Sequence, residues 1–297
     1  MSDKLKNWTV ITGSTGGIGA ELARQLAARG DALILLNRSA SKARAQREEL
    51  LGEYPGLTLE LVDADLMNLT EIRAAIEKIN ELPGRIDALY NVSGLLTANK
   101  VLSVQGYESH FAVNTLAPYL LIHGLRNKMA RPESDEPAMV VNFSSSAING
   151  VKALELDNLA DPDEVGGLFT TYAQTKLALT ALAPALADDL EKQNILIRAI
   201  DPGATKSPMT TEGNSGMPKF LAWIAPLVFA PADKQVAKVV ASAQPAAHEG
   251  RTGVYIANRK VKPLPVPAAD AHQQQRLLEF LDGLIAARSR PTTAGVT

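Results

Sequence analysis

A glycine-rich turn near the start of the chain constrains the fold more than any other feature. Residues 8–12 are apolar and largely β-branched, residues 13–19 read Gly-Ser-Thr-Gly-Gly-Ile-Gly, and residues 20–29 show a helical pattern that ends at Gly30. This order predicts a strand, a tight turn and a helix. Glycines let the backbone approach a ligand closely, and the positive helix end attracts a pyrophosphate. We therefore expect a dinucleotide to contact Gly13, Ser14, Thr15, Gly17, Ile18 and Gly19.

Strand and helix patterns continue to alternate along the chain. Further helices are expected at about 39–53, 106–130, 172–193, 232–243 and 271–287, and further strands at 32–36, 57–62, 86–90, 138–143, 195–200 and 253–257. Such alternation is typical of a parallel sheet with helical crossovers. The sequence predicts an α/β fold, a single Rossmann-type, doubly wound parallel sheet of about seven strands flanked by helices. We expect one catalytic domain over residues 1–290 and a disordered tail over 291–297.

Composition excludes several classes of function. Thirty basic and 32 acidic residues give a net charge of −2 with no basic block, which argues against a nucleic-acid partner. There is no cysteine, and the four histidines lack the spacing of a metal site. The first residues of the chain lack the apolar core of a signal peptide, and no apolar segment is long enough to span a bilayer. We expect a soluble cytoplasmic protein that acts on a small molecule and binds no metal.

Polar residues that follow the second, third and fourth strands suggest how a nucleotide is recognised. Arg38, beside Asn37, stands where an NAD-selective site would place an acid, so the sequence favours NADP(H) with the arginine on the 2′-phosphate. A solvated arginine at a helix start is the alternative. Asp65, followed by Leu66, either accepts from the adenine amino group or caps a helix. After the fourth strand, Gly94 is expected to give a flat wall beside the cofactor, and Asn91 is a further candidate for cofactor binding.

Tyr172 and Lys176 are four residues apart at the start of an alanine- and leucine-rich helix, so they share one face. A phenol has a pKa of about 10 and needs help to exchange a proton at neutral pH. The nearby ammonium would stabilise the phenolate and lower the pKa of Tyr172. Such a pair is common on amphipathic helices and is weak evidence for catalysis by itself. The motifs that precede it in the sequence strengthen the interpretation.

Two polar features of the preceding elements complete the candidate site. Asn114 interrupts the apolar stripe of a predicted helix, and Pro118 cannot donate to its carbonyl, which leaves that carbonyl open to a water molecule. An amide satisfied inside the core is the alternative. The fifth strand ends in Ser144-Ser145-Ser146, where a hydroxyl can donate to a substrate oxygen. After the sixth strand we expect a backbone wall at Pro202 and Gly203 and a hydroxyl at Thr205.

An apolar segment occupies residues 220–229, after Gly213 and Gly216. We interpret residues 205–230 as a mobile lid that would close over an apolar substrate. The alternative is that this segment packs within the protein or forms a dimer interface. The sequence therefore also allows a homo-oligomer.

Taken together, these motifs resemble the short-chain dehydrogenase/reductase family over residues 8–257, in the family's order. They are Thr12-Gly13-x-x-x-Gly17-Ile18-Gly19, Asn91-Val92-Ser93-Gly94, Asn114, Ser144-Ser145, Tyr172-x-x-x-Lys176 and Pro202-Gly203. The resemblance implies a Rossmann-type fold and a catalytic tetrad. In that tetrad Tyr172 is the general acid/base and Lys176 holds the ribose hydroxyls and lowers the tyrosine pKa. Ser145 polarises the carbonyl, and the carbonyl of Asn114 positions a water for proton relay.

The sequence departs from the family pattern at three places. Val92 and Ser93 replace the usual asparagine or cysteine and alanine, and the tail after Ala257 is longer than the family core needs. The separation between Ser145 and Tyr172 is also long, as in the retinol-dehydrogenase-like and protochlorophyllide-reductase-like branches, which leaves open which serine is catalytic. The resemblance implies NADP(H)-dependent hydride transfer to or from a carbonyl or alcohol substrate. The alternatives are a non-catalytic NADP-binding sensor and a carbon–carbon double-bond reductase.

Overall fold

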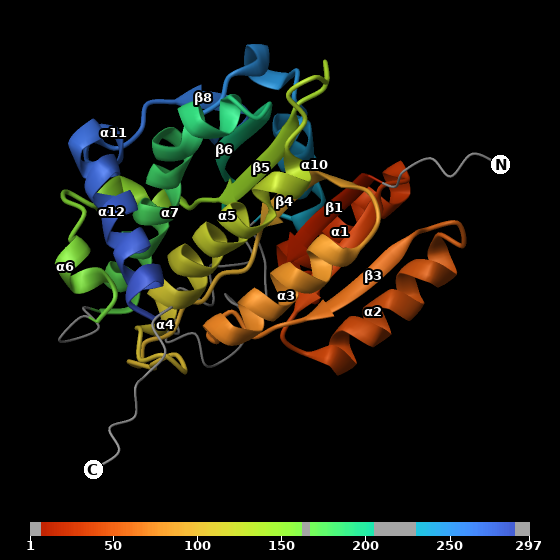
Figure 1. Ribbon diagram of the computed structural model, residues 1–297, viewed down its shortest axis with the longest axis horizontal. Coiled ribbons are helices and arrows are strands. Elements are labelled where there is room, and N and C mark those ends of the chain that lie inside the picture. The colour runs from red at the N-terminus through yellow and green to blue at the C-terminus, as the bar shows by residue number, and fades with distance from the viewer. Residues whose placement is uncertain (1–6, 162–166, 205–229, 289–297) are drawn as a thin grey trace.

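The computed structural model describes residues 7–161, 167–204 and 230–288, and within them eight strands form one sheet (Figure 1). Strands β1 to β7 are parallel, and β8 is antiparallel to β7. The strand order is β3-β2-β1-β4-β5-β6-β7-β8, so the order reverses between β1 and β4. The strands are β1 (Asn7–Thr12), β2 (Ala32–Asn37), β3 (Leu59–Asp63), β4 (Arg85–Asn91), β5 (Ala138–Phe143), β6 (Ile195–Asp201), β7 (Val254–Ala257) and β8 (Lys260–Lys262).

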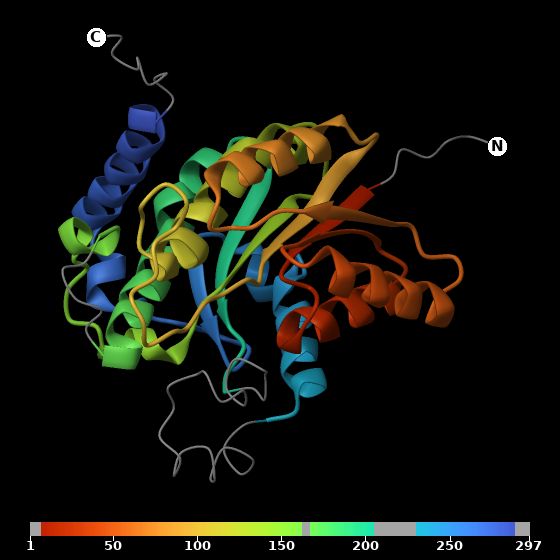
Figure 2. The same cartoon turned by 90° about the horizontal axis from the view of Figure 1, so that it is seen from below.

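Helices cover both faces of the sheet (Figure 2). One face packs against α1 (Gly17–Arg29), α2 (Ala40–Glu53) and α10 (Ala232–Ala243). The other packs against α3 (Leu69–Glu81), α5 (Ala117–Met129) and α7 (Gly167–Glu191). The remaining helices of the described residues are α4 (Ser109–Phe111), the π-helix η1 (Ala112–Leu116), η2 (Ser146–Gly150), α6 (Leu156–Leu159), η3 (Ala247–Gly250), α11 (Val266–Ala269) and α12 (Ala271–Arg288).

The apolar patterns of the sequence explain these layers. Strand β5 is buried along its whole length, as expected for a central parallel strand with helices on both faces. Helix α1 buries Leu22, Ala23 and Leu26, which are spaced to lie on one side. In the outermost layer, α12 packs against α7 and buries Leu277 and Leu281. None of the helices in the described ranges is long and apolar enough to cross a membrane.

The structure confirms the predicted α/β class and doubly wound parallel sheet, with two corrections. Strand β8 was not predicted, because Lys260-Val261-Lys262 carries no apolar run. The single helix expected over 106–130 was wrong: it is divided into α4, the π-helix η1 and α5, with Pro118 near the start of α5. A proline removes a backbone donor, which fits a change of helical hydrogen bonding just before it.

Three expectations are not tested by these residues. The apolar core of the predicted lid, residues 220–229, and the tail at 291–297 lie outside the described residues. The extent of a single domain over residues 1–290 stays a prediction.

Candidate active site

A cavity of about 420 Å³ opens at the carboxyl ends of the strands, where the strand order reverses. This is where open α/β sheets bind ligands. Its lining includes most of the predicted cofactor residues, namely Gly13, Thr15, Gly17, Ile18, Gly19, Asn37, Arg38, Asp65, Leu66, Gly94, Tyr172, Lys176 and Pro202. It also includes residues that were not predicted to bind a ligand, such as Ser39, Lys42, Met67, Leu95 and Val113.

The glycine turn has the backbone geometry that a pyrophosphate site needs. Gly13 and Gly17 have φ angles of 68° and 53°, in the left-handed region that favours glycine. A Cβ atom at Gly19 would lie 2.2 Å from the carbonyl oxygen of Gly13, so only glycine fits there. No side chain in the described ranges caps the N-terminus of α1 at Gly16. The first turn of α1 therefore presents its backbone donors to the cavity, which fits a pyrophosphate.

Ser14 holds this turn to the neighbouring elements. Its Oγ accepts a hydrogen bond from Asn37 Nδ2 and donates one to Gln46 Oε1, both at 2.8 Å. Gln46 Nε2 in turn donates to the carbonyl of Ser14 at 2.6 Å. Ser14 is thus a support of the turn and is absent from the cavity lining. The buried Oδ1 of Asn37 finds no partner among the described residues, which suits an atom that faces a polar ligand.

Two basic side chains and a helix start lie together at one end of the cavity. Arg38 is exposed and follows β2, Ser39 caps α2 by accepting from the backbone N–H of Lys42, and all three residues line the cavity. The positive helix end and the two cations suit a phosphate group. Lys42 was not predicted, although its position one turn into a predicted helix that begins beside Arg38 could have indicated it.

The loop after β3 presents Asp65, Leu66 and Met67 to the cavity. Asp65 Oδ1 accepts from the backbone N–H of Met67 at 2.9 Å. The cap of α3 is Asn68, which accepts from the backbone N–H of Thr70, so Asp65 is not the helix cap. Its contact with an adenine amino group stays a prediction.

The loop after β4 is tied to β1 by a threonine. Thr12 Oγ1 accepts from the backbone N–H groups of Val92 and Ser93, each at 3.0 Å. Asn91 is buried, donates to Asn142 Oδ1 at 2.9 Å and does not line the cavity, whereas Gly94 does. Of this predicted pair, only Gly94 forms part of the cavity wall.

Tyr172 and Lys176 both reach the cavity from one face of α7. Burial raises the pKa of Tyr172, and a hydrogen bond with Ser145 opposes that rise. Lys176 is 3% exposed, and its Nζ donates to the carbonyl of Phe143 at 2.8 Å. Burial lowers the pKa of Lys176 to about 8, while the carboxylate of Asp201 favours its charged form. The net shift of the Tyr172 pKa is therefore opposite to the one predicted, because desolvation of the phenol outweighs its stabilisation.

The three serines after β5 have different surroundings. Ser144 is buried, and its Oγ lies 2.7 Å from Thr180 Oγ1. Since Thr180 uses its own hydrogen on the carbonyl of Lys176, Ser144 is the donor of this bond. Ser146 is exposed at the start of η2. Ser144 belongs to the cavity lining and Ser145 does not, but Ser145 is the serine that opposes the rise in the pKa of the Tyr172 phenol.

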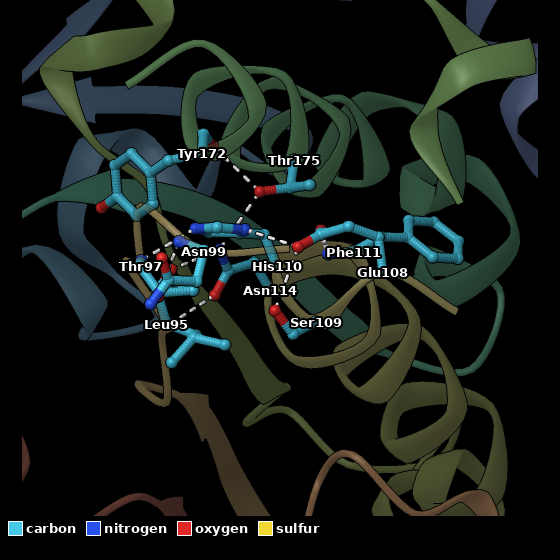
Figure 3. A network of polar contacts seen from close by, with 10 residues as sticks. All are labelled: Leu95, Thr97, Asn99, Glu108, Ser109, His110, Phe111, Asn114, Tyr172 and Thr175. Atoms are coloured by element: carbon cyan, nitrogen blue, oxygen red, sulfur yellow. Dashed lines mark hydrogen bonds and ion pairs between the residues drawn. The ribbon is translucent and has the colours of Figure 1, made fainter. Parts of the chain in front are cut away.

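Asn114 lies on η1 and uses its whole side-chain amide (Figure 3). Its Oδ1 accepts from the backbone N–H of Leu95 at 2.7 Å, and its Nδ2 donates to the carbonyl of Leu95 and to Thr175 Oγ1, both at 3.1 Å. Thr175 Oγ1 donates to the carbonyl of Tyr172 at 2.9 Å. The amide is satisfied inside the protein, as the alternative interpretation held. The role of the Asn114 carbonyl in holding a water stays a prediction.

The turn after β6 completes the cavity wall through Pro202. Gly203 has a φ of 80°, and its N–H donates to Asp201 Oδ1 at 2.8 Å. A Cβ atom at Gly203 would lie 2.6 Å from Gln235 Nε2, so glycine is needed here as well. Gly203 is not part of the cavity lining, and Thr205 lies outside the described residues.

Comparison with protein families gives one consistent match. The family model described as short chain dehydrogenase matches residues 7–156 and 163–218. The chain is 31% identical over 214 residues to the chloroplastic short-chain dehydrogenase TIC 32 A of Brassica napus, covering 70% of this chain and 67% of that protein. It is 28% identical over 272 residues to human polyprenol dehydrogenase, covering 90% and 81%.

Human retinol dehydrogenase 13 is 28% identical over 200 residues, which cover 67% of this chain and 59% of that protein. The chain thus spans less than two thirds of the length of this relative. Because one relative is chloroplastic, the cytoplasmic location stays a prediction.

Solved structures share the fold over nearly the whole chain. A protein from Mycobacterium Paratuberculosis has a TM-score of 0.71 at 22% identity, covering 95% of both chains. The RhlG/NADP active-site complex of Pseudomonas aeruginosa has a TM-score of 0.69 at 24% identity, covering 86% of this chain and 95% of that one.

Proposed function

Because this chain belongs to the short-chain dehydrogenase family, we propose that it is an NADP(H)-dependent oxidoreductase that transfers hydride between the nicotinamide and a carbonyl or alcohol carbon. The observation that carries this proposal is that Tyr172 and the buried Lys176 reach, from one face of α7, the same cavity that contains the pyrophosphate-type turn, with Ser145 opposing the rise in the Tyr172 pKa. A hydroxyl, a phenol and an ammonium arranged in this way can exchange a proton with a substrate oxygen.

The choice of NADP(H) rests on charge. Arg38 and Lys42 line the cavity at the start of α2, and Asn37 is neutral where an acid would favour NAD(H). A structural neighbour solved with NADP supports the same choice. The ribose 2′-phosphate would lie at Arg38, Ser39 and Lys42, and the pyrophosphate at the first turn of α1.

The residues of this chain supply the proton and its environment. The cofactor, when bound, supplies or accepts the hydride. Tyr172 Oη gives its proton to the substrate oxygen in reduction and takes it back in oxidation, and Ser145 donates a hydrogen bond to the same oxygen. The charge of Lys176 stabilises the phenolate that remains, and the Asn114 carbonyl holds the water through which the proton is replaced.

We propose an apolar substrate. The cavity that Tyr172 lines also contains the hydrocarbon side chains of Leu95, Val113 and Phe143, which could contact an apolar substrate. Two relatives are named for retinol and polyprenol, which are apolar alcohols. An apolar wall favours such molecules and excludes water from the site.

A panel of ketones, aldehydes, enones and alcohols, assayed by nicotinamide absorbance with NADPH, NADP⁺, NADH and NAD⁺, tests the proposal. We expect turnover of apolar carbonyl compounds with NADPH, and of the matching alcohols with NADP⁺. Reduction of the carbon–carbon bond of enones alone would instead identify a double-bond reductase. Tight binding of NADPH without turnover of any compound would identify a sensor.

A further inference from the structure

The segment that leaves β4 forms one wall of the candidate active site through Gly94 and Leu95. Its far end returns to the start of α4, where Leu102 forms an antiparallel bridge with Glu108 and the N–H of Ser109 donates to the carbonyl of Val101 at 2.9 Å. The segment therefore begins at the cavity wall and ends beside Glu108, where backbone contacts of Val101 and Leu102 attach it to the start of α4.

Two side chains hold the near end of this segment (Figure 3). Asn114 accepts from the N–H of Leu95 and donates to its carbonyl. His110, four residues earlier, accepts at Nε2 from the backbone N–H of Thr97 at 3.0 Å. Residues four apart lie on the same side of a helix. His110 and Asn114 therefore both hydrogen-bond to the backbone of the segment, at Thr97 and Leu95 respectively.

The contact with Thr97 determines which nitrogen of His110 carries the proton. A backbone N–H can only donate, so Nε2 must offer its lone pair and carries no hydrogen. The remaining nitrogen, Nδ1, lies 2.8 Å from Glu108 Oε1 and therefore donates its hydrogen to that carboxylate. His110 is thus in the Nδ1–H tautomer.

Glu108 has no exposed surface, and its carboxylate accepts three hydrogen bonds. Besides His110, the donors are Ser109 Oγ at 3.0 Å and the backbone N–H of Phe111 at 3.1 Å. Burial raises the pKa of Glu108, but these donors outweigh burial and the net pKa is lowered. An ionised carboxylate only accepts hydrogen bonds, so it selects the tautomer of His110 that places a proton on Nδ1.

We propose that Glu108 and His110 are positioning residues for the reaction, and that they fix the backbone of Thr97, two residues after the cavity-lining Leu95, by holding His110 in its Nδ1–H tautomer. The same network continues from Leu95 through Asn114 and Thr175 to the main-chain carbonyl of Tyr172. The proposal deepens the proposed oxidoreductase function and rests on it for its kinetic consequence. Its structural part can be measured without any turnover.

The first test is the tautomer itself, read from the imidazole ¹⁵N resonances of the full-length labelled protein. We expect a protonated Nδ1 and an unprotonated Nε2 at His110, together with slow hydrogen exchange at the Thr97 amide. In Glu108→Gln the side-chain amide can donate to Nδ1 and permit the other tautomer, so Nε2–H would face the Thr97 N–H. Exchange at Thr97 should then become faster.

The kinetic test compares kcat/KM for an apolar carbonyl with the affinity for NADPH. Misplacing a wall of the site should lower kcat/KM by about 10- to 100-fold in Glu108→Gln while NADPH binding stays unchanged. His110→Gln, whose Oε1 can still accept from Thr97, should retain more activity than His110→Leu. The control is His123→Gln on α5, since His123 is partly buried and packs on Tyr119, outside the cavity lining. It should resemble the wild type in both tests.

An Nε2–H tautomer or an imidazolium at His110 in the wild type would overturn the proposal. Because this ¹⁵N measurement uses the wild type, it tests the proposal even if Glu108→Gln does not fold. Unchanged Thr97 exchange in a folded Glu108→Gln protein would also overturn it, as would losses of kcat/KM in the His123→Gln control equal to those in His110→Leu. If the tautomer and exchange results are as expected but the wild type turns over no substrate, the positioning of the segment stands and the proposed oxidoreductase function fails.

Discussion

The Nζ atom of Lys176 lies 2.8 Å from the main-chain carbonyl oxygen of Phe143 and donates a hydrogen bond to it. This ammonium is almost completely buried, and burial lowers its pKa from 10.5 to about 8. Keeping Lys176 charged therefore costs folding free energy, and this ammonium lies on the same helix face as the phenol with which it is proposed to act.

That cost predicts a pH dependence of stability. Between pH 8 and 10.5 the unfolded chain keeps the proton on Lys176 while the folded protein releases it, so the free energy of unfolding should rise with pH in this window. The rise should amount to as much as about 3 kcal/mol. Urea unfolding of the wild type and of Lys176→Met measures it. The difference between the two curves should change across this window, and parallel curves would contradict the lowered pKa.

The surroundings of Ser144 and Ser145 predict different mutational effects. Ser145→Ala removes the hydroxyl that reaches Tyr172 and should lower kcat by about 100-fold or more. Ser144→Ala removes a buried hydrogen bond to Thr180, so it should cost about 1 kcal/mol of stability with little effect on kcat. Steady-state kinetics and thermal unfolding of both variants distinguish the roles. A larger kinetic loss in Ser144→Ala would show that the catalytic serine had been assigned to the wrong position.

The cofactor preference should depend on the position of charge, not on its total amount. Arg38→Asp should weaken NADPH relative to NADH by about 10- to 100-fold, because a charge-assisted hydrogen bond to the 2′-phosphate is lost. Arg44→Asp, on α2 and outside the cavity lining, makes the same charge change and should leave the preference unaltered. Titration of both variants with NADPH and NADH measures the effect. Equal shifts in the two variants would refute a phosphate site at Arg38.

Arg198 on β6 predicts a large loss of stability without a kinetic counterpart. This buried guanidinium donates to the carbonyls of Arg251, Ser242, Gln244, Pro245 and Ala247. Arg198→Met would leave these acceptors without their donor and should cost about 3 kcal/mol or more. Arg24→Met removes a partly exposed ion pair with Glu21 and should cost less than about 1 kcal/mol. Chemical denaturation compares them, and equal losses would show that the buried carbonyls find other donors.

The sheet and most of the cavity lining could be predicted because they depend on local patterns. Apolar runs that end in glycine or polar residues locate the carboxyl ends of β1, β2 and β4, and the topology brings those ends together. Gln46 and His110 could not be predicted, since each acts on a backbone far along the chain: Gln46 on Ser14, and His110 on Thr97. The hydrophobic periodicity that predicts helices and strands carries no information about such side-chain contacts.

The pKa shifts of Tyr172 and Lys176 also could not be predicted from the sequence. The spacing of Tyr172 and Lys176 indicates that they share a helical face, but the direction of their pKa shifts depends on how deeply the surrounding elements bury them. The π-helix before Pro118 is a similar case, because the proline indicates a disturbance but not its form.

The comparison of Tyr172→Phe with the wild type, at saturating NADPH and with an apolar carbonyl compound, tests the proposed function most directly. The variant keeps the ring and loses only the hydroxyl that exchanges the proton, so we predict that turnover falls by about 100-fold or more while the Kd for NADPH is unchanged. Turnover equal to that of the wild type, with NADPH bound equally well, would contradict the account.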